Sequence, residues 1–156
     1  MRIPCLLMCG LAFGTGCAGG VGEVTGTVTQ GGKPLPGATI VLAPDPPGPG
    51  RHAATAVTGA DGTFTARTHK PGGETLGGVE AGSYRVTVSK LIPPNGLSEA
   101  EYLKKIAESG GGIYSPDAGP PSRVESVPPE FSDSAKTRLR VEVTASAGKP
   151  LRVEIP

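Results

Sequence analysis

The chain has 156 residues, among them 25 glycines and 17 prolines, and it has no tryptophan. So many helix breakers exclude a long helical bundle or a coiled coil, and the length excludes a large multidomain enzyme. The net charge of +1 provides no electrostatic basis for binding nucleic acid or anionic lipid headgroups. The composition therefore favours a small β protein with many turns and no nucleic-acid partner.

Residues 1–16 have the features of a secretory signal peptide. Arg2 precedes a short apolar run that ends in small residues, and this run is too short to span a bilayer as a mature helix. All three cysteines, Cys5, Cys9 and Cys17, lie at this end of the chain. Cleavage before Cys17 would leave a single thiol, so no intramolecular disulfide is expected in the mature chain.

The segment Gly14-Thr15-Gly16-Cys17 resembles the lipobox of bacterial lipoproteins, in which small residues precede a lipidated cysteine. The pattern usually has leucine where this chain has Gly14. The resemblance implies cleavage before Cys17, a lipid thioether on Cys17, and a membrane anchor in the bacterial cell envelope, followed by a tether over residues 17–22. In the alternative interpretation the signal is an ordinary secretory one and Cys17 has no role.

Alternation of apolar and polar residues predicts seven short strands separated by turn signals. The Gly31-Gly32 pair and the Asp61-Gly62 pair are typical of tight turns. Phe64 and Tyr84 are expected in the core, and the Tyr84 hydroxyl is expected to bond a nearby backbone group. These features indicate an all-β, antiparallel sandwich with strands at 23–29, 38–43, 53–58, 63–68, 83–89, 138–144 and 150–155.

The last two strands are expected to form a hairpin. If Thr144 pairs with Pro150, then Glu142 faces Arg152 and Arg140 faces Glu154. Both cross-strand pairs then have opposite charges, and the apolar residues also face each other.

Residues 91–130 interrupt the strand pattern as an insertion rich in proline and glycine. Ser98 and Glu101 form a capping box before a short helix, and Gly110-Gly111-Gly112 is expected to end it. Leu103, Ile106 and Ala107 form one apolar stripe on this helix. Since a single short helix is marginal alone, it is expected to dock on the sandwich.

Four segments in this order resemble the carboxypeptidase regulatory-like, or transthyretin-like, domain of small bacterial lipoproteins. They lie within residues 24–40, 58–64, 82–88 and 127–133, and the resemblance covers residues 22–156. It implies a seven-stranded antiparallel Greek-key sandwich of the transthyretin-like, Ig-like kind. It also implies an accessory or surface module rather than a catalyst.

A search for catalytic or metal-binding patterns finds no complete motif. His52 and His69 belong to no zinc motif, and no G-x-S-x-G sequence is present. Asp61 lies in a glycine-flanked turn with too few acidic neighbours for calcium, so it is interpreted as a turn former. No enzyme activity, cofactor or metal is therefore predicted. A hydrolase would require a pocket in which one histidine meets a carboxylate and a third polar group.

Two functional hypotheses remain. The first is a non-enzymatic, lipid-anchored module of the cell envelope that is structural or binds a protein. The second is a sandwich that binds carbohydrate or peptidoglycan. If the domain has a binding surface, it is expected at Tyr102, Tyr114 and Phe131, in or beside the insertion, because exposed aromatic residues make good contacts. The alternative is that these three side chains pin the insertion onto the sandwich.

Overall fold

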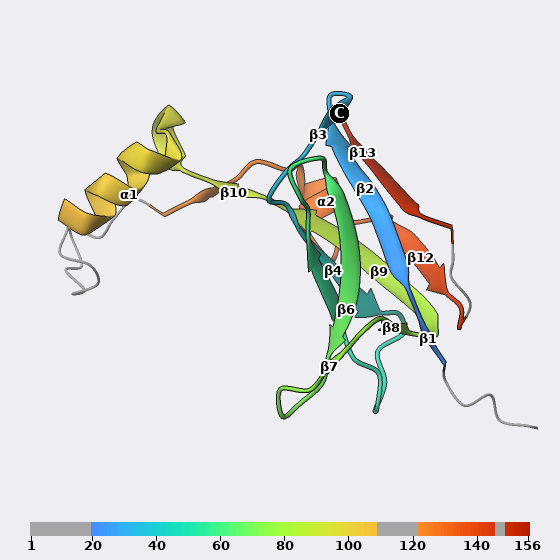
Figure 1. The fold of residues 1–156 in the computed structure, drawn as a ribbon. Helices are drawn as coiled ribbons and strands as arrows, with labels where there is room; N and C mark the ends of the chain where they lie inside the picture. The colour runs from blue at the N-terminus through green and yellow to red at the C-terminus, as the bar shows by residue number, and fades with distance from the viewer. Residues whose placement is uncertain (1–19, 109–121, 146–148) are drawn as a thin grey trace, which may run out of the picture.

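A computed structural model describes residues 20–108, 122–145 and 149–156 (Figure 1). The predicted signal peptide, Cys17, Gly110-Gly111-Gly112 and Tyr114 lie outside the described residues. The account below concerns the described parts of the chain.

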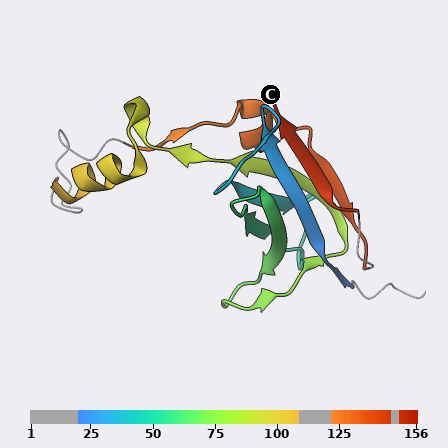
Figure 2. The ribbon, with the colours of Figure 1, turned by 45° about the horizontal axis from the view of Figure 1, so that its top comes forward.

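Seven strands form one continuous hydrogen-bonded path that curls into two layers (Figures 1 and 2). Strand β6 belongs to both layers, because its first half pairs with β2 and its second half pairs with β5. The prediction of an all-β sandwich is confirmed, and every predicted strand has a counterpart. In path order the strands are β12 (Arg140–Val143), β9 (Gly82–Ser89), β4 (Thr39–Pro44), β5 (Ala54–Val57), β6 (Thr63–His69), β2 (Val24–Gln30) and β13 (Leu151–Ile155).

Shorter elements extend this framework. β1 (Val21–Gly22) pairs with β8 (Val79–Glu80), while β3 (Lys33–Pro34) and β7 (Thr75–Leu76) pair with β2 and β6. The insertion contains a ribbon of β10 (Leu91–Ile92) and β11 (Val124–Glu125). Its helical elements are η1 (Pro94–Gly96), α1 (Glu99–Glu108) and α2 (Pro129–Ser132).

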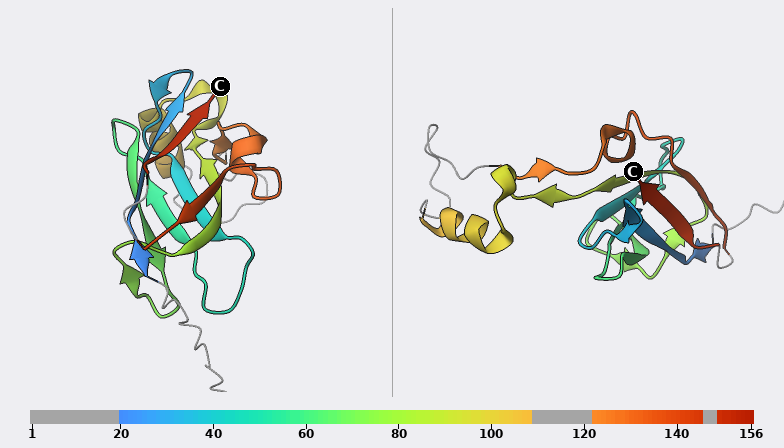
Figure 3. Two further views of the ribbon diagram at one scale, coloured as in Figure 1. Left: turned by 90° about the vertical axis from the view of Figure 1, so that its right-hand side faces the viewer. Right: turned by 90° about the horizontal axis from the view of Figure 1, so that it is seen from above.

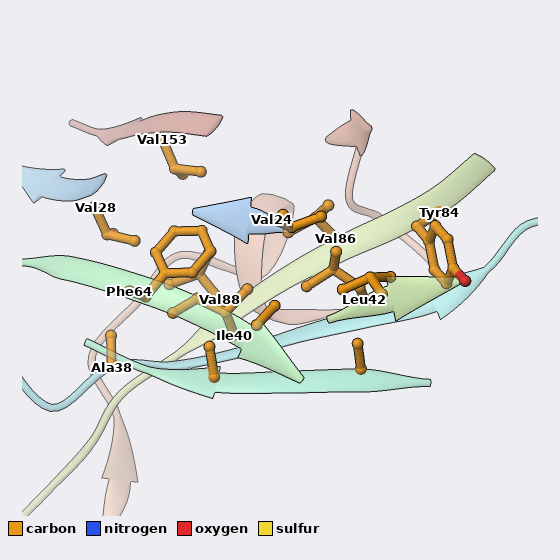
Figure 4. Packing of buried hydrophobic residues seen from close by; sticks show 14 of the residues in the cluster. Val24, Val28, Ala38, Ile40, Leu42, Phe64, Tyr84, Val86, Val88 and Val153 are labelled. Carbon is orange, nitrogen blue, oxygen red and sulfur yellow. The ribbon is translucent and has the colours of Figure 1, made fainter. Parts of the chain in front are cut away.

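The core lies between the layers, where alternate residues of each strand meet (Figure 4). Phe64 projects from β6 toward Val86 and Val88 of β9, and Tyr84 of β9 is fully buried. As predicted, the Tyr84 hydroxyl bonds the backbone, donating to the Glu80 carbonyl oxygen at 2.8 Å. Burial raises the pKa of Tyr84, which keeps this hydroxyl protonated as a donor.

Two predicted turns form as their residue types require. Gly31 and Gly32 both have positive φ and close the turn between β2 and β3, a conformation that residues with a Cβ adopt at a cost. Gly62 also has a positive φ, and a Cβ there would lie 2.6 Å from the Val28 carbonyl oxygen. Asp61 acts as a turn former, since its Oδ1 accepts hydrogen bonds from the Thr63 amide and hydroxyl.

The predicted C-terminal hairpin is wrong. β12 pairs antiparallel with β9, so Glu142 lies opposite Ser83, and β13 pairs parallel with β2, so Arg152 lies opposite Thr27. Arg140 finds its acidic partner in Asp45, at 3.0 Å between Nε and Oδ2. The two strands are the opposite ends of the strand path, and their outward charges suit exposed edges.

The prediction that the short helix docks on the sandwich is also wrong. α1 lies away from both layers, at the end of the β10–β11 ribbon (Figures 1 and 3). By contrast α2, which closes the insertion, packs beside β9. Phe131 of α2 is partly buried against the core.

Replacing Thr58 by valine should lower the free energy of unfolding by about 1–3 kcal/mol. The buried Thr58 hydroxyl donates to the Leu35 carbonyl oxygen at 2.6 Å and accepts from the Ala38 amide at 2.8 Å. Valine keeps the shape but leaves both buried backbone groups unpaired. Urea denaturation measures the change.

The matched control is Thr65→Val, at an exposed position of β6, where the change should stay below about 0.5 kcal/mol. Equal losses in the two variants would contradict a specific role for the Thr58 hydroxyl.

Candidate binding arm

The insertion forms an arm that projects from the sandwich, here defined as the described residues 90–108 and 122–125. Strand β9 continues through Lys90 into β10, and β11 returns beside β10 with Leu91 opposite Glu125 and Ile92 opposite Val124. η1 and α1 occupy the far end of this ribbon (Figure 3). The arm is therefore a direct extension of a core strand.

Hydrogen bonds to one carboxylate fasten the base of the arm. The Glu125 side chain accepts from the Ser89 hydroxyl, from the Lys90 amide at 2.8 Å and from the Val127 amide at 2.9 Å. Partial burial alone would raise the pKa of Glu125, but these hydrogen bonds outweigh it and lower the pKa below its usual value. The Ser126 amide also donates to the Lys90 carbonyl oxygen at 2.9 Å.

A second set of contacts caps α1 and fastens it to the returning chain. The predicted capping box is present, since the Ser98 amide donates to Glu101 Oε2 at 2.8 Å and the Glu101 amide donates to Ser98 Oγ at 3.3 Å. Arg123 forms an ion pair with Glu99 and lies over the Tyr102 ring, 4.7 Å from its centroid. The hydrogen bond from Arg123 lowers the pKa of Glu99.

The arm concentrates exposed aliphatic side chains. Of the six large apolar side chains that are exposed in the described residues, four lie on it: Leu91 at 55%, Ile92 at 37%, Leu103 at 54% and Val124 at 45% exposed. The other two, Val21 and Val57, lie on separate strands. Clusters of exposed apolar residues mark interaction sites in soluble domains.

The structure does not unite the aromatic residues expected to form a surface. Tyr102 is buried beneath Arg123 in the arm, while Phe131 lies on α2 against the core. The helices that carry them, α1 and α2, lie at opposite ends of the β10–β11 ribbon (Figure 1). Tyr102 and Phe131 thus each pin their own helix, and Tyr114 lies outside the described residues.

Sequence reasoning missed the aliphatic residues of the ribbon. Leu91 and Ile92 directly follow the alternating strand, and two adjacent apolar residues there break its period-two pattern. That break, just before Pro93, was the available signal.

The histidines have polar neighbours in the sandwich. His52 Nδ1 lies 3.3 Å from both carboxylate oxygens of Glu80, at the point where the 45–53 loop returns beside β8. His69 lies between the hydroxyls of Thr55 and Thr75, with Nε2 2.9 Å from the first and Nδ1 3.3 Å from the second. Within the described residues, no three His, Cys, Asp or Glu side chains gather as a metal site.

Three comparisons with known proteins found no match to this chain. No protein-family model, curated protein or solved structure matches the chain significantly. Separately, no helix of the described segments has the length and apolarity needed to cross a membrane.

Protonation of Glu125 should loosen the base of the arm. A carboxylate whose folded pKa lies below its usual 4.5 stabilises the fold above that value and loses this effect as the pH falls through the folded pKa. Amide hydrogen exchange at Lys90 and Val127, corrected for intrinsic rates, should therefore show protection at neutral pH that declines below 4.5.

Glu125→Gln should remove much of that protection already at pH 7, because the neutral amide is a weaker acceptor. Glu130→Gln, at an exposed position of α2, is the matched control and should exchange like the wild type. Wild-type protection in Glu125→Gln would show that the carboxylate does not hold the arm.

Proposed function

We propose that this chain is a non-enzymatic, lipid-anchored module of the bacterial cell envelope that binds a partner protein through its arm. The observation on which this proposal rests is the arm itself, which is held at its base and exposes four aliphatic side chains. A rigid apolar projection loses little conformational entropy on binding. It is suited to docking against another protein.

The envelope location is supported by the N-terminal sequence. The predicted signal peptide and the resemblance of Gly14-Thr15-Gly16-Cys17 to a lipobox point to export and lipidation at Cys17. The resemblance to the carboxypeptidase regulatory-like domain of small bacterial lipoproteins supports the same interpretation. A thioether-linked diacylglyceryl group together with an N-acyl chain provides the multiple acyl chains that stable anchoring requires.

The exposed residues favour a protein over a glycan. Sugar rings stack on exposed aromatic faces, whereas Tyr102 is covered by Arg123 and Phe131 is partly buried. Aliphatic side chains such as Leu91, Leu103 and Val124 instead suit the apolar centre of a protein interface. Binding of peptidoglycan remains the alternative outcome of the tests below.

Cys17→Ser should abolish membrane anchoring. The full-length wild type, expressed in a bacterium, should partition into the detergent phase on phase separation and have an intact mass raised by the attached lipid. Cys17→Ser should be exported without lipid or retained as an uncleaved precursor. Cys9→Ser, in the predicted leader, is the matched control and should behave as the wild type. Loss of partitioning in both variants, or in neither, would contradict lipidation at Cys17.

The arm should be required for capturing a protein partner. Ile92 and Val124 lie directly opposite each other in the ribbon and are both exposed, so replacing both by serine removes apolar surface without emptying the core. Crosslinking in native membranes should recover one protein in near-equal amount with the wild type. The Ile92→Ser and Val124→Ser double variant should lose it.

Val57→Ser, at a 65% exposed position of β5, is the matched control and should retain the partner. Equal recovery of the partner protein with the arm variant would overturn the proposed role of the arm. So would the result that the wild type recovers no protein and instead co-sediments with isolated peptidoglycan.

A further inference from the structure

We infer that the end of the sandwich formed by β1, β8 and the described residues Ala145 and Lys149 lies against the lipid headgroups, while the arm points away from the bilayer. This inference rests on the proposed lipidation of Cys17. It assigns a membrane-facing surface and an orientation that lipidation alone does not specify.

The first argument is the length of the tether. Cys17 precedes Gly20 by three residues, and three residues span at most about 10 Å when fully extended. A lipid-bearing Cys17 sits at the membrane surface, so Gly20 must lie within about that distance of it.

The second argument is that Gly20 is attached to the sandwich. Its carbonyl oxygen accepts a hydrogen bond from the Ala81 amide at 2.9 Å, and the next residue, Val21, pairs with Glu80. On the other side, a Cβ built on Gly20 would lie 2.4 Å from the Cβ of Ala145. Gly20 is therefore held between two parts of the fold, and the described residues from Gly20 onward do not lengthen the tether.

These contacts identify the surface nearest the bilayer. Val21 is 46% exposed there, and the exposed Lys149 lines a recess with Glu23 and Thr144. Because the domain is brought to the membrane by the acyl chains, this surface faces the headgroups without needing a basic patch.

The arm leaves the sandwich from the opposite side. β1 lies at one end of the sandwich and α1 projects beyond the other, and both relations hold in views from the side and from above (Figures 1 and 3). A short tether at β1 thus directs the exposed residues Leu91 and Leu103 away from the lipid. There they are accessible to a protein in the aqueous compartment.

Site-specific quenching tests the orientation. The lipidated full-length mature protein is reconstituted in vesicles of phosphatidylethanolamine and phosphatidylglycerol that contain a nitroxide-headgroup lipid. Since the thioether blocks Cys17, a fluorophore attaches only at an introduced cysteine, either Lys149→Cys at the anchored end or Ala107→Cys on α1. The label at position 149 should lose most of its emission, and the label at position 107 should keep nearly all of it.

The outcomes separate this inference from the proposed function. Absence of lipid in the intact mass would overturn the anchoring itself. Lipidated protein with equal quenching at both positions, or stronger quenching at 107, would overturn the orientation while the anchoring stands. A flexible Gly/Ser insertion of about 12 residues before Gly20 adds an end-to-end distance of about 20 Å and should relieve the quenching at 149. Undiminished quenching would contradict the tether argument.

Discussion

The rest of the structure depends on strand β9 and its pairing on both sides. It pairs with β4 from Thr39↔Ser89 to Pro44↔Tyr84 and with β12 on its other edge. Its alternate residues Tyr84, Val86 and Val88 are fully buried. Because the same strand runs on into β10, the arm takes its direction from the sandwich. A change in the core at β9 would therefore also displace the exposed surface of the arm.

Polar contacts around the start of β9 connect the 45–53 loop of this small fold to β9 and β12. Asp45 pairs with Arg85 at 3.3 Å and with Arg140 at 3.0 Å, joining the 45–53 loop to β9 and β12. Arg51 donates to the Ser83 carbonyl oxygen at 3.0 Å and lies 5.5 Å from the centroid of the Tyr84 ring. These partly exposed contacts orient loops rather than supply large stabilisation. They order the end of the sandwich that we place at the membrane.

The proposed function follows from the separation of two features. One end of the sandwich begins three residues after Cys17, and the arm projects from the other. Glu125 at the base and Arg123 at the far end hold the arm together, so its apolar residues are presented in one arrangement. Such preorganisation favours binding because less freedom is lost when a partner docks. A flexible loop with the same residues would bind less well.

The sequence by itself determined the main strands and the tight turns between them, because alternation and glycine placement are local. It identified the seven strands of the main path but not the six two-residue strands of the described chain, and it also identified the Gly31-Gly32 turn, the Ser98–Glu101 capping box and the buried Tyr84. Only the tertiary structure decided which strands are neighbours. Arg140 and Glu142 show the reason: an outward charge is compatible with a hairpin partner, with an exposed edge, or with a distant residue such as Asp45. The projection of the arm was likewise not predicted. Whether α1 docks or projects depends on the directions of β9 and β11, which the tertiary structure sets.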